Sequence, residues 1–280
     1  MSLKNNVTII TGASTGIGEE LAYQLADQGA HLVLTARRVA ELERVADKIA
    51  ARVAANGTKG TKVIVVSADV AVQADCKKII DAAITEFGRI DTLVNNAGMT
   101  MWAKFEDIQD VDMLARIMQV NYMGSVYCTY FALPHLKASK GRIVGVASLT
   151  GLVGVPTRTG YAASKHAMRG FFDSLRIELA DAGVSVTMIY PGFVATGIRE
   201  NATGADGKPA LIDPVDQAGV MSVAECTALI VQALKNRKRE EVMTLKGKLG
   251  QWLKLIAPGV IDGMAKKAVE GNQKFVEGKQ

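Results

Sequence analysis

Short apolar runs rich in β-branched residues alternate with helical stretches through most of the chain, and this alternation constrains the fold most. Between the runs, apolar residues recur three and four positions apart, as at Leu21 and Leu25. Near-continuous apolar strands separated by helix-length segments are typical of a parallel sheet covered on both faces. The sequence therefore predicts one doubly wound α/β domain that binds ligands at the carboxyl ends of its strands. The predicted strands cover residues 6–13, 30–36, 62–70, 90–98, 141–148 and 184–192.

The composition excludes several other classes of protein. Hydrophobic residues make up 49% and charged residues 22% of the 280, which is sufficient for a large core. The three cysteines (76, 128 and 226) and three histidines (31, 135 and 166) are dispersed, which argues against a disulfide framework and predicts no metal site. No signal-sequence pattern precedes the first strand, and no apolar run reaches the ~20 residues of a membrane span. We therefore expect a cytoplasmic protein.

The first predicted strand leads directly into a glycine-rich segment, TGASTGIG at 11–18. Its glycines, Gly12, Gly16 and Gly18, permit a tight turn and let backbone N–H groups approach a pyrophosphate. The negative charge of that group is favoured at the N-terminus of the helix that follows. Such a cluster alone is a weak signal, but its position after the first strand indicates a dinucleotide site.

The end of the second predicted strand, LTARR, discriminates between nicotinamide cofactors. Ala36 stands where an NAD site carries an acid for the ribose 2′-OH, and Arg37 and Arg38 follow it. A guanidinium matches a 2′-phosphate, which an acid would repel. The sequence thus favours NADP(H), although two solvated surface arginines remain an alternative.

Five motifs, taken in order, resemble the short-chain dehydrogenase/reductase family, in its compact single-domain branch. Together they are far more specific than a lone Y-x-x-x-K. The resemblance covers roughly residues 5–200 and implies a Rossmann-type fold. It also implies an oxidoreductase that transfers a hydride between NADP(H) and a carbonyl or secondary alcohol. The motifs are TGASTGIG at 11–18, NNAG at 95–98, Asn121, Ser148 with YAASK at 161–165, and YPGFVAT at 190–196.

The resemblance implies a catalytic group of Asn121, Ser148, Tyr161 and Lys165. Tyr161 and Lys165 lie at i and i+4, so they share a helix face. We expect the ammonium of Lys165, with an oxidised nicotinamide, to lower the pKa of Tyr161 into a range useful for proton transfer. Tyr161 would exchange a proton with the substrate oxygen, which Ser148 would hold. Lys165 would anchor the nicotinamide ribose, and Asn121 would position a water.

The resemblance also implies a larger cofactor-binding group. The residues at 69–70 match adenine contacts, those at 95–98 match a ribose wall, and those at 191–196 match the segment that orients the nicotinamide carboxamide. Thr15 stands where several NADP-preferring relatives carry a basic residue, so the preference for NADP(H) depends on Arg37 and Arg38. The full group is Gly12, Ser14, Thr15, Gly16, Ile17, Gly18, Arg37, Arg38, Asp69, Val70, Asn95, Ala97, Gly98, Tyr161, Lys165, Pro191, Gly192, Val194 and Thr196.

The catalytic domain is expected to span residues 1–245, with a polar, glycine- and proline-bearing substrate lid at 193–223. Apolar residues at the expected pocket borders predict a hydrophobic substrate, although they suit an ordinary core equally well. The family resemblance implies a homodimer or homotetramer packed through helices near 106–137 and 161–182. No nucleic-acid partner is expected. The border residues are Met99, Met101, Trp102, Leu149, Leu152 and Val153.

A basic helical extension is predicted over residues 246–280. From Lys235 onward the chain carries eleven Lys and Arg against five Asp and Glu. Its apolar residues recur at helical spacing in two segments separated by Pro258 and Gly259. We favour the interpretation that these helices pack on the protein and shape the pocket mouth; the alternative is contact with an anionic membrane surface. The apolar positions are Leu249, Trp252, Leu253 and Ile256, then Ile261, Met264, Ala265 and Ala268.

Two other functions are weighed against a dehydrogenase. A sugar-nucleotide epimerase or dehydratase uses a similar fold and Tyr–Lys pair, but the longer C-terminal domain and different glycine spacing of that branch are not seen. A catalytically silent NADP-binding sensor or scaffold is disfavoured by the intact catalytic group.

Overall fold

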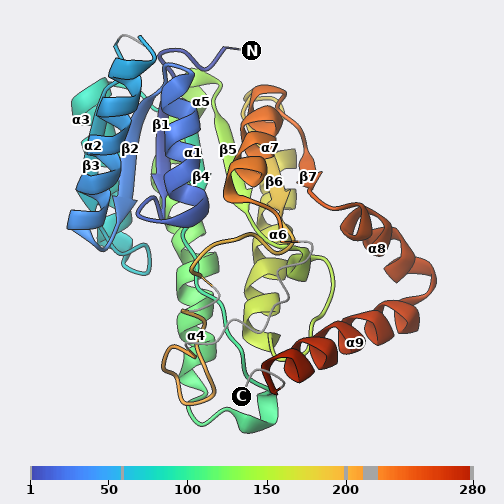
Figure 1. Cartoon of the computed structure of the whole chain (residues 1–280). Coiled ribbons are helices and arrows are strands. Elements are labelled where there is room, and N and C mark those ends of the chain that lie inside the picture. Colours follow the sequence, from blue (N-terminus) through green and yellow to red (C-terminus); the bar gives the residue numbers. More distant parts are fainter. Residues whose placement is uncertain (1, 58–59, 199–200, 211–219, 278–280) are drawn as a thin grey trace.

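The computed structural model describes residues 2–57, 60–198, 201–210 and 220–277. These residues form a seven-stranded parallel sheet in the order β3-β2-β1-β4-β5-β6-β7 (Figure 1). All six apolar runs predicted as strands belong to this sheet, whose two faces are both covered by helices. The strands are β1 (Val7–Thr11), β2 (His31–Ala36), β3 (Val63–Ser67), β4 (Thr92–Asn95), β5 (Arg142–Val146), β6 (Ser185–Tyr190) and β7 (Glu240–Val242).

Helices alternate with the strands and cover both faces, as the sequence predicts for a doubly wound fold. Short η1 (Phe105–Asp107) and η3 (Leu149–Gly151) are single 3-10 turns, and η2 (Gln119–Met123) is a π-helical turn. The α-helices are α1 (Gly16–Asp27), α2 (Val39–Ala55), α3 (Gln73–Phe87), α4 (Asp112–Met118), α5 (Gly124–Ser139), α6 (Thr159–Glu178), α7 (Val223–Lys235), α8 (Leu245–Ile256) and α9 (Pro258–Glu277).

The core lies in two layers, one on each face of the sheet. Successive residues of a strand point to opposite faces, so Ile9 packs in one layer and Ile10 in the other, both fully buried. Helices α3, α5 and α6 supply the first layer, and α1, α2 and α7 supply the second. The two layers hold the sheet rigidly and fix the positions of the loops at its carboxyl edge.

The six predicted strands are confirmed, whereas β7 was not predicted. This strand contains only three residues, and two of them are glutamates, so it shows no apolar run. Glu241 is buried, and its carboxylate pairs with Lys238 and Lys248. Hydrogen bonding to β6 and these ion pairs, rather than hydrophobic patterning, define β7.

The C-terminal hairpin of α8 and α9 follows β7 and stands apart from the layers of the sheet (Figure 1). Both helices were predicted, but α9 runs to Glu277 and is longer than the second apolar segment indicates. Of the helices in the described ranges, none is both long and apolar enough to cross a bilayer.

Candidate active site

A cavity of about 370 Å³ opens at the carboxyl edge of the sheet, where the loops after β4, β5 and β6 meet. Open α/β sheets bind ligands at this edge, because the strand ends leave a crevice between loops. Eight of the predicted cofactor residues line the cavity, together with Ser148. They are Ile17, Gly98, Tyr161, Lys165, Pro191, Gly192, Val194 and Thr196.

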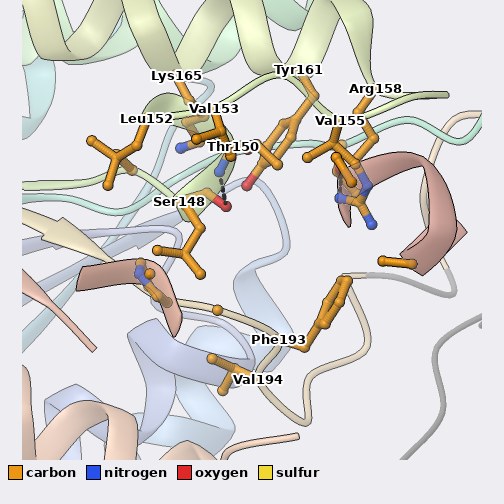
Figure 2. A pocket seen from close by; sticks show the side chains of 18 of the residues that line it. Ser148, Thr150, Leu152, Val153, Val155, Arg158, Tyr161, Lys165, Phe193 and Val194 are labelled. Atoms are coloured by element: carbon orange, nitrogen blue, oxygen red, sulfur yellow. Dashed lines mark hydrogen bonds between the residues drawn. The ribbon is translucent and has the colours of Figure 1, made fainter. Parts of the chain in front are cut away.

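Tyr161, Lys165 and Ser148 meet on one side of this cavity (Figure 2). Helix α6 presents Tyr161 and Lys165 from adjacent turns, and the Lys165 Nζ lies 5.7 Å from the centre of the Tyr161 ring. The Lys165 Nζ donates to the carbonyl oxygen of Val146 at 2.8 Å. Ser148 follows β5 and accepts a hydrogen bond from the Thr150 N–H at 3.3 Å, which orients its hydroxyl. The shared helix face predicted for Tyr161 and Lys165 is confirmed.

The electrostatics of this group differ from the prediction. Burial raises the pKa of the Tyr161 phenol, while the nearby Arg158 charge and hydrogen bonding to Ser148 oppose that rise. Burial also lowers the pKa of the Lys165 ammonium to about 7. Lys165 is not among the groups that oppose the rise at Tyr161, and its expected effect together with an oxidised nicotinamide stays a prediction. Arg158 supplies the charge that opposes the rise, because a guanidinium stays protonated even where burial lowers the pKa of a lysine.

Asn121 lies in the π-helical turn η2 between α4 and α5, and it is fully buried. Its side-chain amide donates to the Met99 carbonyl at 3.0 Å and to the Ser164 hydroxyl at 2.9 Å. Its side-chain oxygen accepts from the Met99 N–H at 2.8 Å. Asn121 thereby ties the loop after β4 to α6. Such π-turns are often found at functional sites, because they re-aim one side chain within a helix.

The glycine loop between β1 and α1 fits a pyrophosphate. Gly12 has a φ of +67°, and a Cβ there would lie 2.8 Å from the Cα of Ala97. A Cβ at Gly18 would lie 2.2 Å from the Gly12 carbonyl oxygen, so a side chain is excluded at both positions. Thr15 precedes α1 in an extended conformation, and its side chain makes no capping hydrogen bond in the described structure. The bare backbone and the helix dipole suit an anion.

The arginines after β2 lie exposed at the expected place for a 2′-phosphate. Arg38 is the residue before α2, and the Arg37 carbonyl accepts from the Ser67 hydroxyl at 3.2 Å. A third arginine, Arg44, was missed by the sequence analysis. Its guanidinium donates to the Ser14 carbonyl of the glycine loop at 3.2 Å and pairs with Glu19 at 2.7 Å. The only feature of the sequence that could have indicated Arg44 is its basic side chain on the helix that follows LTARR.

The predicted cofactor residues at the ends of β3 and β4, other than Gly98, do not line the cavity. The Asp69 carboxylate accepts from the Ala71 N–H at 2.9 Å, and the Ala97 N–H donates to the Thr11 hydroxyl at 3.0 Å. The Asn95 side chain is buried and donates to Thr129 on α5, so it points into the core. Its neighbour Asn96, which was not singled out, lines the cavity. Val70 is also buried, against Gly124 at the start of α5.

Arg158 is a further cavity residue that the sequence analysis missed. It is 6% exposed, its Cζ lies 3.5 Å from the centre of the Trp102 ring, and it donates to the Thr100 hydroxyl at 3.0 Å. The same Cζ lies 5.7 Å from the centre of the Tyr161 ring. Figure 2 shows Arg158 beside Val155 at the Tyr161 side of the cavity. The available signal was a charged residue shortly after the apolar border residues Leu149, Leu152 and Val153.

The cavity wall is mainly apolar, as predicted, but not all of the predicted border residues line it. Trp102, Leu149, Leu152 and Val153 line it, whereas Met101 is a fully buried member of a separate core cluster on which Met99 packs. Within the predicted lid at 193–223, residues 199–200 and 211–219 lie outside the described residues. The described part pairs with the loop after β4, since the Trp102 N–H donates to the Thr203 carbonyl at 2.9 Å.

The C-terminal hairpin forms part of the cavity wall, and α9 supplies most of that part. The favoured interpretation of the hairpin holds for α9. It holds only in part for α8, because Lys246, Gly247 and Gly250 line the cavity, whereas Leu249, Trp252 and Ile256, predicted to pack on the protein, are 65–84% exposed. The cavity residues from the hairpin are Lys246, Gly247, Gly250, Ile261, Met264, Ala265, Ala268 and Val269.

Comparison with known proteins adds independent evidence. A family model described as short chain dehydrogenase matches residues 6–207. The Arabidopsis thaliana protein 11-beta-hydroxysteroid dehydrogenase-like 4A is 39% identical over 265 residues, which cover 95% of this chain and 85% of that protein. A short chain dehydrogenase/reductase from Burkholderia phymatum, solved in complex with NAD, superposes with a TM-score of 0.79 at 27% identity, covering 93% and 96% of the two chains. An alcohol dehydrogenase from the archaeon Thermococcus sibiricus, complexed with 5-hydroxy-NADP, gives a TM-score of 0.69 at 26% identity, covering 82% and 90%.

Proposed function

Since the chain belongs to the short-chain dehydrogenase family, we propose that it is an NADP(H)-dependent oxidoreductase acting on a hydrophobic carbonyl or secondary alcohol. The observation that carries the proposal is the convergence of Tyr161, Ser148 and Lys165 on one wall of an apolar cavity. Arg37 and Arg38, with Ala36 in place of an acid, support NADP(H) over NAD. The glycine loop supports a bound pyrophosphate.

The proposed chemistry assigns one task to each member of the catalytic group. When bound, NADPH supplies the hydride that reduces the carbonyl carbon. Tyr161 donates its phenolic proton to the carbonyl oxygen, which the Ser148 hydroxyl holds by a hydrogen bond. Lys165, held by the Val146 carbonyl, binds the nicotinamide ribose. Asn121 fixes the spacing between the loop after β4 and α6, and it positions a water that links Lys165 to solvent.

A homologous series of alkyl methyl ketones tests the proposed substrate class. With NADPH as cofactor, kcat/KM should rise about fourfold per added methylene until the cavity is filled, because burying a CH₂ contributes about 0.8 kcal/mol. A dependence that is flat or falls with chain length would contradict a hydrophobic substrate. Absence of NADPH oxidation with every carbonyl would favour the silent sensor, and turnover of sugar nucleotides without net NADPH consumption would favour the epimerase.

We expect Arg158 to act as a positioning residue that stabilises the Tyr161 phenolate. Alcohol oxidation needs that phenolate, so its rate rises as pH passes the pKa of Tyr161. Substituting Arg158→Leu removes a cation 5.7 Å from the ring and should move this rise to higher pH. The measurement is the pH profile of kcat/KM for oxidation. The matched control, Arg158→Lys, keeps the charge and should return the profile toward that of the unsubstituted protein; an unmoved profile in Arg158→Leu would contradict this role.

We further propose a homodimer or homotetramer assembled through α5 and α6. Tyr130 on α5 and Ile177 on α6 are 68% and 75% exposed, and oligomerisation would cover them. The three cysteines are free and buried, which supports a reducing compartment such as the cytoplasm.

A further inference from the structure

We propose that the α8–α9 hairpin docks on an anionic lipid bilayer through an exposed apolar face, so that the cavity mouth opens against the membrane. The hairpin connects to the rest of the protein through β7 and stands out from the layers of the sheet (Figure 1). We define the docking face as Leu245, Leu249, Trp252, Leu255, Ile256, Val260 and Met264.

The docking face is the largest concentration of exposed apolar side chains in the described structure. Its seven members are 53–84% exposed, and they are nearly half of the fifteen large hydrophobic residues that the described chain exposes. No residue of α8 is buried, and Ile261 is the one buried residue among those of α9 with described side chains. Exposed apolar side chains gathered on one hairpin indicate a site that contacts a partner.

The spacing of these residues gives the face its shape. On α8, Leu245, Leu249, Trp252 and Ile256 lie at i, i+4, i+7 and i+11, which forms one continuous stripe. A tryptophan in such a stripe suits the headgroup region, because the indole combines an apolar ring with a polar N–H. An amphipathic helix of this type lies in the plane of the interface with its apolar side in the acyl boundary.

The charges around the docking face indicate which kind of partner it would bind. Residues 245–268 contain five lysines and one acid, Asp262. An anionic bilayer attracts basic residues next to an inserted apolar stripe. A second copy of this chain is a poorer match, because a twofold interface centred on this face would bring the same lysines of both copies together. The lysines are Lys246, Lys248, Lys254, Lys266 and Lys267; of these, Lys248 pairs with Glu241, Lys266 pairs with Glu270, and the Lys254 Nζ donates to the Leu152 carbonyl.

The hairpin links the docking face to the cavity. Met264 belongs to both, since it lines the cavity and is 53% exposed. Ile261 and Ala265 line the cavity from the same helix. This part of the inference rests on the proposed function: an apolar substrate dissolved in the bilayer would reach the cavity without crossing water.

Co-sedimentation with vesicles tests the proposal without turnover, so its outcome is independent of the proposed chemistry. The full chain should sediment with vesicles of phosphatidylcholine and phosphatidylserine at low salt. Binding should fall about tenfold or more at high salt or with phosphatidylcholine alone, because the lysines act through screened charge. Equal binding of the protein to both lipids, or none to either, would overturn the proposal.

Variants distinguish vesicle binding through the docking face from non-specific adsorption of the protein. Trp252→Glu with Leu255→Glu should abolish sedimentation, while the control Val111→Glu, at a residue 65% exposed beside α4, should not. Neither Trp252 nor Leu255 lines the cavity, so NADPH-dependent reduction of a small water-soluble ketone by the double variant should be unchanged without vesicles. Lys267→Gln, which leaves the apolar face intact, should weaken binding at low salt. If the double variant instead lowers the oligomer mass by light scattering and leaves vesicle binding unchanged, the face belongs to a second copy and the proposal is wrong.

Discussion

Substituting Tyr161→Phe should lower kcat/KM for carbonyl reduction about 10²- to 10⁴-fold, the range that a positioned general acid contributes. The substitution removes one hydroxyl from a buried ring and leaves the ring's packing between the cavity and the cluster around Met101 intact. Affinity for NADPH, measured by fluorescence titration, should stay within about twofold, because the glycine loop and the arginines after β2 are untouched.

Tyr190→Phe is a matched control for this experiment. Tyr190 is fully buried, and its hydroxyl has no hydrogen-bond partner among the described residues. Loss of that hydroxyl should leave turnover near that of the unsubstituted protein. If Tyr161→Phe also retained near-parental turnover, Tyr161 would not be the proton donor, and the assignment of the catalytic group would be wrong.

Substituting Arg37→Asp should shift the cofactor preference from NADPH toward NADH. The change replaces a cation that matches the 2′-phosphate with an anion that repels it, and hydrogen bonds to charged groups contribute about 1.5–3 kcal/mol. We therefore expect the ratio of kcat/KM for NADPH to that for NADH to fall at least about tenfold. Arg38→Asp, assayed in parallel, identifies which arginine contributes more.

Reversing a charge far from the cavity controls for the change in the overall electrostatic field of the protein. Arg239 lies just before β7, at the opposite edge of the sheet from the cavity, and it is 67% exposed. Arg239→Asp should leave the cofactor ratio unchanged. If the ratio of kcat/KM for NADPH to that for NADH barely changes in Arg37→Asp and Arg38→Asp, another part of the chain binds the 2′-phosphate.

The sequence predicts the architecture well, because burial on both faces of a parallel sheet produces a local pattern. Strands β1 to β6, the edge strand β3 included, lie in apolar runs, so they were found from hydrophobicity alone. β7 was missed because Glu240 and Glu241 break that pattern. The strand depends on hydrogen bonds to β6, which is distant in the chain, and on ion pairs of Glu241 with the nearby Lys238 and Lys248. Such non-local stabilisation leaves no periodic signal.

The composition of the site was predictable, but its electrostatics were not. Motif spacing brings Tyr161 and Lys165 to one helix face, and the structure agrees. The pKa of each depends on burial, and that of Tyr161 depends also on Arg158, which reaches the Tyr161 ring only after the loop before α6 has folded beside Trp102. Likewise, helical spacing predicts an apolar stripe on α8 but does not tell whether it faces the protein or its surroundings.

The most direct test of the central claim is a transfer of isotope in the ketone assay. NADPH carrying deuterium at C4 of the nicotinamide is incubated with the protein and a long-chain methyl ketone, and the product alcohol is analysed by mass spectrometry. The account predicts one deuterium on the carbinol carbon, transferred from a single face of the nicotinamide, and none in the Tyr161→Phe reaction beyond its residual rate. Alcohol without deuterium from either labelled face, or no alcohol at all with NADPH and NADH across the ketone series, would contradict it.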